Sequence, residues 1–504
     1  MDGEPTPAEQ LEQARAVLAT GDVDAARTWF RRLLDGPDEV HALKATIDLA
    51  NLESNAGNIE AARRYGQAAI ATNDPEQAPK AWANLGTHER QAGNLDAARA
   101  AFRAAIATGH PQQGARAQYQ LGALEAGEGE ADAARTAFGK VLESGSLLHG
   151  PRALALLGDV ERSAGNLDAA RAAYRAAAGT PDANARATAL YRLGCLENSD
   201  QQLDAAAEAF RAAIDSDHIA VPAMAGIQLG NLERNRGRLD EARAIFEGCA
   251  ALDHHVESPK ALVSLGLLEQ ATGNVDAARD ALHRAIAMGG GDETARAHVV
   301  LGELEIEAGN DDAARGALET VARSAGPKRA KALILLGQLE QRSGHRAAAR
   351  RAFEEAITTN DPIEAPNAVI QLFSGEFRRV ETASARRSLR AIIAGGDPER
   401  VPVALMALVT VELHAKDIPA AIAVMHEAVA TGHPAHGPKA MVMLADFQTC
   451  RQGSHAGRKV YEHYLDCDDP SLEGFARNQI EQFDSAPVLA RGWSGWRDRI
   501  AGRT

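Results

Sequence analysis

The apolar positions of this chain recur with helical spacing inside a unit that repeats every 36 residues. In the third copy, Ala98, Phe102 and Ala105 fall at i, i+4 and i+7, which places them on one face of a helix. The seven-residue frame GNLDAAR and its variants occur thirteen times, and every step is 36 residues except the 35-residue step from Gly309 to Gly344. The frames begin at Gly21, Gly57, Gly93, Gly129, Gly165, Gln201, Gly237, Gly273, Gly309, Gly344, Val380, Lys416 and Gln452. This register predicts stacked copies of one supersecondary unit.

Each copy predicts two helices joined by a short turn. In the third copy, helix A begins near Pro79, because proline suits a first helical turn. It ends at Gly93, where a left-handed cap costs little. Asn94 is then expected to cap helix B with its side chain, and helix B ends near Gly109.

Two further positions recur in nearly every copy. Helix B carries an aromatic slot, represented by Phe102, and helix A carries a Leu–Gly pair, represented by Leu85 and Gly86. A glycine inside a helix costs about 0.5–1 kcal/mol relative to alanine. Its recurrence therefore predicts that another helix packs closely against helix A at this point.

The fold predicted from these patterns is all-α, a right-handed α-solenoid superhelix of about thirteen 36-residue helix–turn–helix repeats. One continuous solenoid is expected over residues 1–470, with an N-terminal capping helix at about 7–20 and divergent repeats at about 368–470. Residues 471–504 are expected to form a C-terminal capping helix and tail.

The pattern resembles the tetratricopeptide repeat (TPR) family, whose signature places Leu–Gly in helix A, Gly at the turn, and Ala, an aromatic residue and Ala in helix B. The matching residues here are Trp82, Leu85, Gly86, Gly93, Ala98, Phe102 and Ala105. The period is 36 rather than the 34 of that family, and Glu89 stands where the family carries tyrosine. The stretch from Ala107 to Gly122 also resembles Sel1-like repeats. The resemblance covers nearly the whole chain and implies a groove that binds protein or peptide partners.

Two charged columns run through the copies, represented by Glu89 in helix A and Arg99 in helix B. One interpretation is a ladder of Glu–Arg pairs that fixes how neighbouring helices dock. The other is a line of carboxylates for acid–base chemistry. Because catalysis needs one distinct site rather than the same residue in every copy, the sequence favours the structural interpretation.

A third column of basic residues lies near the start of helix A and supplies the candidate partner-binding residues. Its members are Lys44, Lys80, Arg116, Arg152, Lys260, Arg296, Lys331 and Lys439. The resemblance to the TPR family implies that this position faces the groove and grips acidic segments. The alternative is a solvated rim of charges that pair with local Asp or Glu. Thr188, Met224, Asn367 and Val403 interrupt the column.

Composition narrows the functional classes. The net charge of −15 disfavours binding to nucleic acid or to an anionic membrane surface. The four cysteines form no CxxC pair, and His110, His254, His255 and His433 match no standard ligand spacing, so neither a metal nor a cofactor is expected. The first ten residues lack the features of a signal peptide. These features together predict a cytoplasmic protein without membrane insertion.

The sequence thus predicts a protein- or peptide-binding scaffold rather than an enzyme. A ligand- or peptide-responsive regulator is the alternative, and an enzyme hosted on a helical array is a weaker one. Trp493 and Trp496 near the C-terminus are open to two interpretations. They seal the last repeat as part of a cap, or they dock a partner, because tryptophan is favoured in binding hot spots.

Overall fold

The computed structural model describes residues 5–374, 382–465 and 469–485. This part of the chain contains 27 α-helices and no strand, and the predicted all-α class is confirmed. The chain divides into two compact units, Met1–Cys249 (unit 1) and Ala250–Thr504 (unit 2). Whether residues 1–470 form one continuous solenoid stays a prediction.

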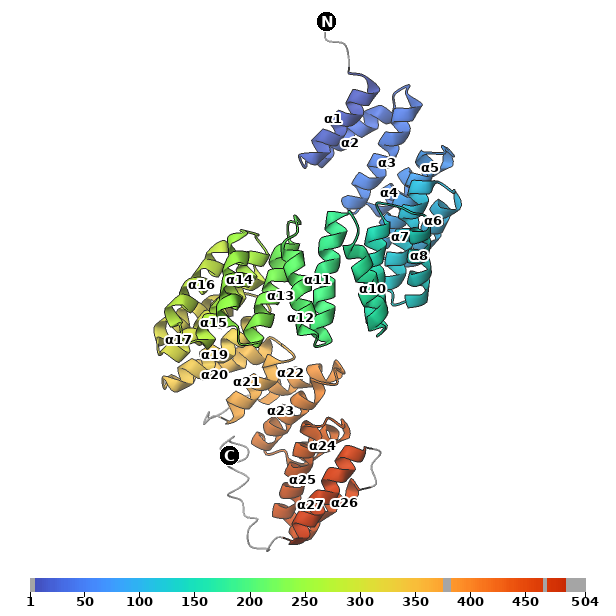
Figure 1. The fold of residues 1–504 in the computed structure, drawn as a ribbon. Coiled ribbons are helices and arrows are strands. Elements are labelled where there is room, and N and C mark those ends of the chain that lie inside the picture. The colour runs from blue at the N-terminus through green and yellow to red at the C-terminus, as the bar shows by residue number, and fades with distance from the viewer. Residues whose placement is uncertain (1–4, 375–381, 466–468, 486–504) are drawn as a thin grey trace. The chain divides into compact units, whose positions relative to one another are not determined.

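Unit 1 consists of helical hairpins whose two helices pack against each other (Figure 1). Its helices are α1 (Pro7–Ala19), α2 (Val23–Leu34), α3 (Glu39–Asn55), α4 (Ile59–Ala71), α5 (Gln77–Gln91), α6 (Leu95–Ala107), α7 (Pro111–Gly127), α8 (Ala131–Glu143), α9 (Gly150–Ser163), α10 (Leu167–Ala178), α11 (Ala183–Ser199), α12 (Leu203–Ile214), α13 (Val221–Asn235) and α14 (Leu239–Ala251), which contains the boundary. The odd-numbered helices are the predicted A helices, and the even-numbered helices are the predicted B helices.

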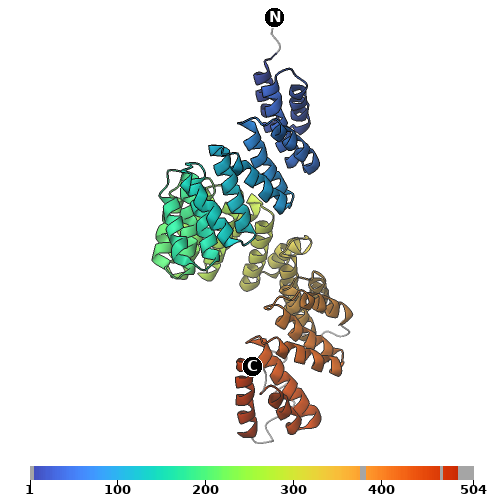
Figure 2. The same cartoon turned by 90° about the vertical axis from the view of Figure 1, so that its right-hand side faces the viewer.

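Unit 2 continues the hairpin pattern (Figure 2). Its helices are α15 (Glu257–Ala271), α16 (Val275–Met288), α17 (Asp292–Ala308), α18 (Asp311–Ala322), α19 (Arg329–Arg342), α20 (Arg346–Thr358), α21 (Glu364–Ser374), α22 (Thr382–Ala394), α23 (Val401–His414), α24 (Ile418–Ala430), α25 (His436–Gln452), α26 (Ser454–His463) and α27 (Pro470–Ser485). The 35-residue step lies in this unit, and the pair Arg315–Glu340 accordingly spans 25 residues where the equivalent pairs of other copies span 26.

The recurring glycine of helix A makes room for the aromatic slot of helix B. A Cβ built on Gly86 would lie 2.5 Å from Cδ1 of Phe102, which is fully buried. The predicted close approach is therefore that of a ring rather than of a second helix backbone. Gly93 at the turn has a φ of 78°, a conformation that favours glycine.

Asn94 stands at the N-cap position of α6, but the expected side-chain cap is wrong. No side-chain cap hydrogen bond forms there. Instead Asn94 Nδ2 donates to Glu89 Oε2 at 2.8 Å. The physical reason is that a buried carboxylate requires hydrogen-bond donors, and the asparagine amide supplies one.

The predicted N-terminal helix is present as α1. Thr6 and Glu9 form a capping box, in which Glu9 N–H donates to Thr6 Oγ1 and Thr6 N–H donates to Glu9 Oε2. Leu11 and Ala14 are buried in the core that α1 shares with α2. At the other end of the chain, α27 buries Leu472 and Ala476.

Candidate functional site

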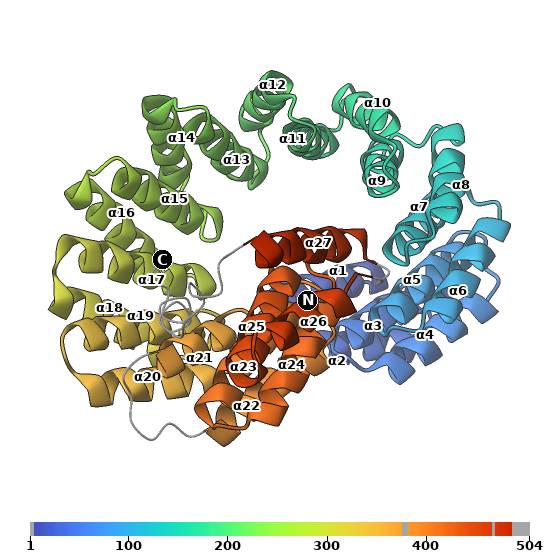
Figure 3. The same ribbon diagram turned by 90° about the horizontal axis from the view of Figure 1, so that it is seen from below.

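The exposed surface of the odd-numbered helices of unit 1 carries the candidate site, and we call it the A-helix face. Successive odd-numbered helices contact one another, as α5 does α7 and α7 does α9. Figure 3 shows α5, α7, α9 and α11 following one another along one side of unit 1, with α6, α8, α10 and α12 along the other. Residues at equivalent positions of neighbouring A helices therefore lie in a row.

The Glu–Arg column joins successive hairpins and does not form a distinct site. Arg63 of α4 donates to Glu89 of α5 from Nε at 2.7 Å and from Nη2 at 2.9 Å. Equivalent pairs are Arg27–Glu53, Arg99–Glu125, Arg135–Glu161, Arg171–Glu197, Arg279–Glu305, Arg315–Glu340 and Arg386–Glu412. The predicted structural pairing is confirmed for these copies.

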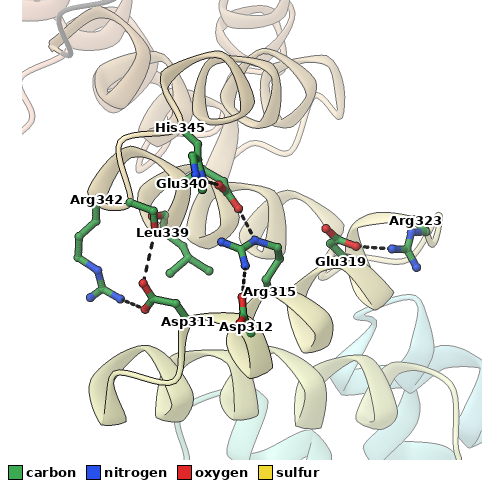
Figure 4. A network of polar contacts seen from close by, with 10 residues as sticks. Asp311, Asp312, Arg315, Glu319, Arg323, Leu339, Glu340, Arg342 and His345 are labelled. Atoms are coloured by element: carbon green, nitrogen blue, oxygen red, sulfur yellow. Dashed lines mark hydrogen bonds and ion pairs between the residues drawn. The ribbon is translucent and has the colours of Figure 1, made fainter.

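Figure 4 shows one such pair in unit 2. Arg315 Nε donates to Glu340 Oε1 at 2.6 Å, and Arg315 Nη1 donates to Asp312 Oδ1 at 2.7 Å. His345 takes the place that Asn94 has in α6, and its Nδ1 lies 2.6 Å from Glu340 Oε2. In five of these copies the carboxylate is thus held between an arginine of the preceding helix and a polar residue of the following turn; the carboxylates are those of Glu53, Glu89, Glu161, Glu305 and Glu340.

Glu233 of α13 is an exception to this arrangement. Ala207 occupies the arginine position of α12, and the Glu233 carboxylate is fully buried. Arg211, Arg236 and Arg238 approach it instead, at 3.3, 3.6 and 3.1 Å. The charge is still neutralised, so this departure from the repeat compensates a missing cation.

The basic column occupies the first turns of the A helices, and its two halves differ in pairing. In unit 2, Lys260 pairs with Glu257 at 2.9 Å, Arg296 with Glu293 at 3.5 Å and Lys331 with Glu303 at 3.2 Å. Lys439, the last member of the column, has no ion pair among the described residues.

In unit 1, Lys44, Lys80 and Arg116 have no ion pair within the described ranges. The one carboxylate near Arg152 is that of Asp182, at 3.9 Å. The structure therefore brings four cations of the column together in unit 1 with little local neutralisation.

For two of the unit 2 cations, the residue three positions earlier explains the pairing. In unit 2 it is Glu257 before Lys260 and Glu293 before Arg296, one helical turn away. Lys331 instead reaches Glu303 of the preceding A helix, α17. In unit 1 the corresponding residues are His41, Gln77, Gln113 and His149. The sequence contained this signal, but the column of cations alone did not reveal it.

Several polar atoms beside the unit 1 cations are buried without a hydrogen-bond partner among the described residues. They include Gln77 Oε1, His88 Nδ1 and His149 Nδ1. Arg116 makes one long hydrogen bond, 3.5 Å from Nη1 to Gln113 Oε1. Unsatisfied buried polar groups are rare in native proteins, and Thr294 Oγ1 and His298 Nδ1 on either side of Arg296 in unit 2 are unsatisfied in the same way.

The electrostatics of the A-helix face reflect burial without counter-charge. Burial lowers the pKa of the Arg116 guanidinium. Burial and then the charges of Arg152 and Arg116 lower the pKa of His149. For His88, burial lowers the pKa, Glu89 opposes that shift, and Arg116 adds to it. The charges of Arg116 and Arg152 thus act on the neighbouring histidines and favour their neutral form.

A hollow of about 280 Å³ lies at the end of this row, between α7, α9 and α11. Its lining includes Tyr119, Arg152, Leu156, Thr188 and Arg192. The Tyr119 ring stacks on the His149 ring, with centroids 5.5 Å apart. The hollow thus joins a cation of the column to an aromatic and an apolar wall.

Other residues singled out by the sequence contribute nothing to this face. Trp493 and Trp496 lie outside the described residues, so both interpretations of them stay predictions. The rings of His254 and His255 stack on each other at 5.1 Å. Within the ranges described, no three His, Cys, Asp or Glu side chains gather in a metal-binding arrangement.

None of the described helices is long and apolar enough to cross a membrane. The cytoplasmic location and the exclusion of nucleic acid as a partner stay predictions.

Comparison with known proteins places the chain in a family. No curated protein matches it. Solved structures with a similar fold include PilF of Pseudomonas aeruginosa (20% identity, 42% of this chain and 92% of that one, TM-score 0.34), MamA (24%, 34% and 95%, 0.28) and yeast Tom70 (13%, 94% and 99%, 0.38). A tetratricopeptide repeat model matches residues 47–114, 119–187, 191–253 and 263–330, which together exceed half of the chain. The chain therefore belongs to the tetratricopeptide repeat family.

Proposed function

We propose that this protein is a protein-binding scaffold and that the A-helix face of unit 1 holds an extended acidic segment of a partner. Membership of the tetratricopeptide repeat family supports a protein-interaction scaffold in general. The contacts to the segment are assigned to Lys44, Lys80, Arg116 and Arg152. The role is one of binding, and no catalytic residue is assigned.

The observation that carries the proposal is that Lys44, Lys80 and Arg116 have no carboxylate partner among the described residues, and that Arg152 has one only at 3.9 Å. Lys260 and Arg296 of unit 2 are neutralised by a glutamate one turn earlier, whereas Lys80 and Arg116 follow glutamines. A half-buried guanidinium such as Arg116 loses hydration without gaining an ion pair, and this is unfavourable in the free protein. A bound carboxylate would remove that cost.

An extended segment fits a row of this kind. Successive A helices of unit 1 contact one another and contribute one cation each, so a chain that crosses them meets the cations in turn.

The test is fluorescence anisotropy with a labelled ten-residue peptide of alternating alanine and glutamate. The triple variant Lys80→Glu, Arg116→Glu and Arg152→Glu is expected to weaken binding by about tenfold or more, because charge complementarity becomes repulsion. Binding by the unaltered protein is expected to weaken with added salt, since these charges are partly exposed.

The matched control is the triple variant Lys260→Glu, Arg296→Glu and Lys331→Glu, which makes the same charge change in unit 2. Its affinity for the peptide is expected to stay within about twofold of the unaltered protein, because those cations are already paired. Equal losses in both triple variants would show a nonspecific charge effect and refute the proposal. So would full affinity in the unit 1 variant.

A further inference from the structure

The hollow at the end of the basic row has a polar lining rich in side chains that can donate hydrogen bonds. Arg152 and Arg192 line it from two neighbouring A helices, Tyr119 and Thr188 carry hydroxyl groups, and Asn184 and His218 complete the polar lining. Leu156 provides an apolar wall. A guanidinium donates and never accepts. The chemistry of this lining therefore suits a carboxylate carried on a short apolar stem.

Arg192 is held in place by a carboxylate on the neighbouring helix. Its Nη1 lies 2.7 Å from Oδ2 of Asp159 on α9, and both side chains are 30% exposed. The other oxygen of that carboxylate, Oδ1, accepts a hydrogen bond of 2.6 Å from the Tyr174 hydroxyl. Arg192 is thus oriented by Asp159, and Asp159 is oriented by a residue that does not line the hollow.

Tyr174 reaches Asp159 from the aromatic slot of helix α10, where the side chain is fully buried. A Cβ built on Gly158 would lie 2.4 Å from Cε1 of this ring, so the glycine lets the ring pass beside α9. Burial, followed by the hydrogen bond to Asp159, raises the pKa of the tyrosine, and its hydroxyl therefore stays a donor at neutral pH. Arg162 also lies near this hydroxyl.

The repeat itself supplies a comparison. In the other copies the aromatic slot holds phenylalanine, leucine, methionine or glycine, with one exception, Tyr461. The residue that corresponds to Asp159 in the copy containing Tyr461 is Asp446, and no other copy has aspartate there. Tyrosine therefore occurs in the slot only where an aspartate stands fifteen residues before it. Filling the slot alone does not require a hydroxyl, since phenylalanine does so elsewhere.

We infer that the hollow is a subsite for one carboxylate of the acidic segment, that Arg152 and Arg192 bind this carboxylate, and that Tyr174 is a positioning residue which holds Arg192 through Asp159. The inference rests on the proposed function and adds a defined anchor to it. Because Asp159 already neutralises Arg192 in part, the hollow takes a single negative charge rather than two.

The experiment measures how strongly the protein distinguishes glutamate from glutamine at each position of the labelled alanine–glutamate peptide. At one peptide position, replacing glutamate with glutamine is expected to cause the largest loss of affinity. The Arg192→Gln variant of the protein is expected to show no preference for glutamate at that position. Tyr174→Phe is expected to reduce it about fivefold, since a hydrogen bond to a charged group is lost. Peptides with free and with amidated carboxyl termini separate a side-chain carboxylate from a chain terminus as the occupant.

The controls separate positioning from folding. Tyr174→Phe restores the usual slot residue, so the variant is expected to keep its helical circular dichroism spectrum and to unfold cooperatively, with a melting temperature lowered only by the lost hydrogen bond. In the Arg192→Gln background it is expected to have no further effect, because the group it positions is gone. Tyr65→Phe removes a hydroxyl that makes no hydrogen bond in the described structure, and it is expected to leave discrimination unchanged.

Unaltered discrimination in Tyr174→Phe, or additive effects with Arg192→Gln, would overturn the inference while leaving the proposed function intact. Failure of the unaltered protein to bind any of the acidic peptides would overturn both.

Discussion

Arg63 of α4 and Glu89 of α5 join two successive hairpins through a bidentate ion pair, with Nε–Oε1 at 2.7 Å and Nη2–Oε2 at 2.9 Å. Glu89 is only 3% exposed. The hydrogen bond from Arg63 outweighs burial and lowers the pKa of this carboxyl, so it stays ionised inside the protein. The pair therefore links the hairpins only as long as both partners are present.

Replacing Arg63 with methionine is expected to destabilise the protein by about 3 kcal/mol, because a buried carboxylate loses its cation. Urea unfolding followed by circular dichroism at 222 nm measures the change. The control is Arg64→Met, which removes the neighbouring exposed cation and is expected to change stability by about 0.5 kcal/mol or less. Equal effects of the two substitutions would contradict a linking role for the pair.

Gly86→Ala is expected to destabilise the protein by about 1–3 kcal/mol, although alanine is the better helix former. The reason is that the new Cβ would lie 2.5 Å from the buried ring of Phe102. Gly139→Ala is the matched control, because it lies inside helix α8 with no atom within 4 Å of the added Cβ. It is expected to stabilise by about 0.5–1 kcal/mol. Thermal unfolding of both variants tests whether the two substitutions change stability in opposite directions. A Gly86→Ala variant that is more stable than the unaltered protein would refute the packing argument.

Much of the fold could be predicted because each copy repeats the same physical constraints. The expected helix A near Pro79 is α5, Gln77–Gln91, and the expected turn at Gly93 has the left-handed φ. Pairing of the Glu and Arg columns was predictable as well, since a buried charge that recurs in most copies needs a recurring partner. The role of Asn94 was mispredicted because its side chain can either cap α6 or hydrogen-bond to the buried carboxylate of Glu89, and it does the second.

The candidate site was less predictable, because it depends on what neighbours each side chain in space. The column contained Lys80 and Lys260 as equivalent residues, but only the structure shows Lys260 paired with Glu257. The hydrogen bond from Tyr174 to Asp159 joins residues fifteen positions apart on two helices. Most other copies carry a slot residue without a hydroxyl group, so the repeat pattern gave no reason to expect this bond. Periodicity identifies what the copies share, whereas a binding site consists of what they do not share.

Acid is expected to destabilise the protein in two steps. Burial lowers the pKa of His88 and His149 below the ordinary 6.5, so the unfolded chain takes up protons first as the pH falls. Their contribution to stability is thus complete above pH 6.5 and is lost below it. Glu89 accounts for the second step. Its pKa in the folded protein is lowered, so it stabilises the fold above pH 4.5, and this contribution is lost as the pH falls through the pKa of the folded state.

Urea midpoints at about pH 7.5, 5.5 and 4 measure the two steps. His88→Gln is expected to reduce the loss of stability between the first two pH values, because glutamine does not titrate. The loss of stability between the second and the third pH value is expected to stay unchanged. A loss between pH 7.5 and 5.5 that is the same in the variant would show that His88 does not contribute to the first step.

Gln201 and Lys416 stand at frame positions where most copies have glycine, and both have a φ of 60°. A side chain in this left-handed region costs about 1 kcal/mol relative to glycine. Gln201→Gly and Lys416→Gly are therefore each expected to raise the free energy of unfolding by about that amount. Gly165→Gln is the reverse change in the hairpin before Gln201, where φ is 78° and an added Cβ would have no atom within 4 Å. Its cost is then purely conformational and is expected to be similar in size and opposite in sign. Calorimetric melting of the three variants compares them directly, and a Gln201→Gly variant no more stable than the unaltered protein would show that the glutamine side chain compensates its own backbone strain.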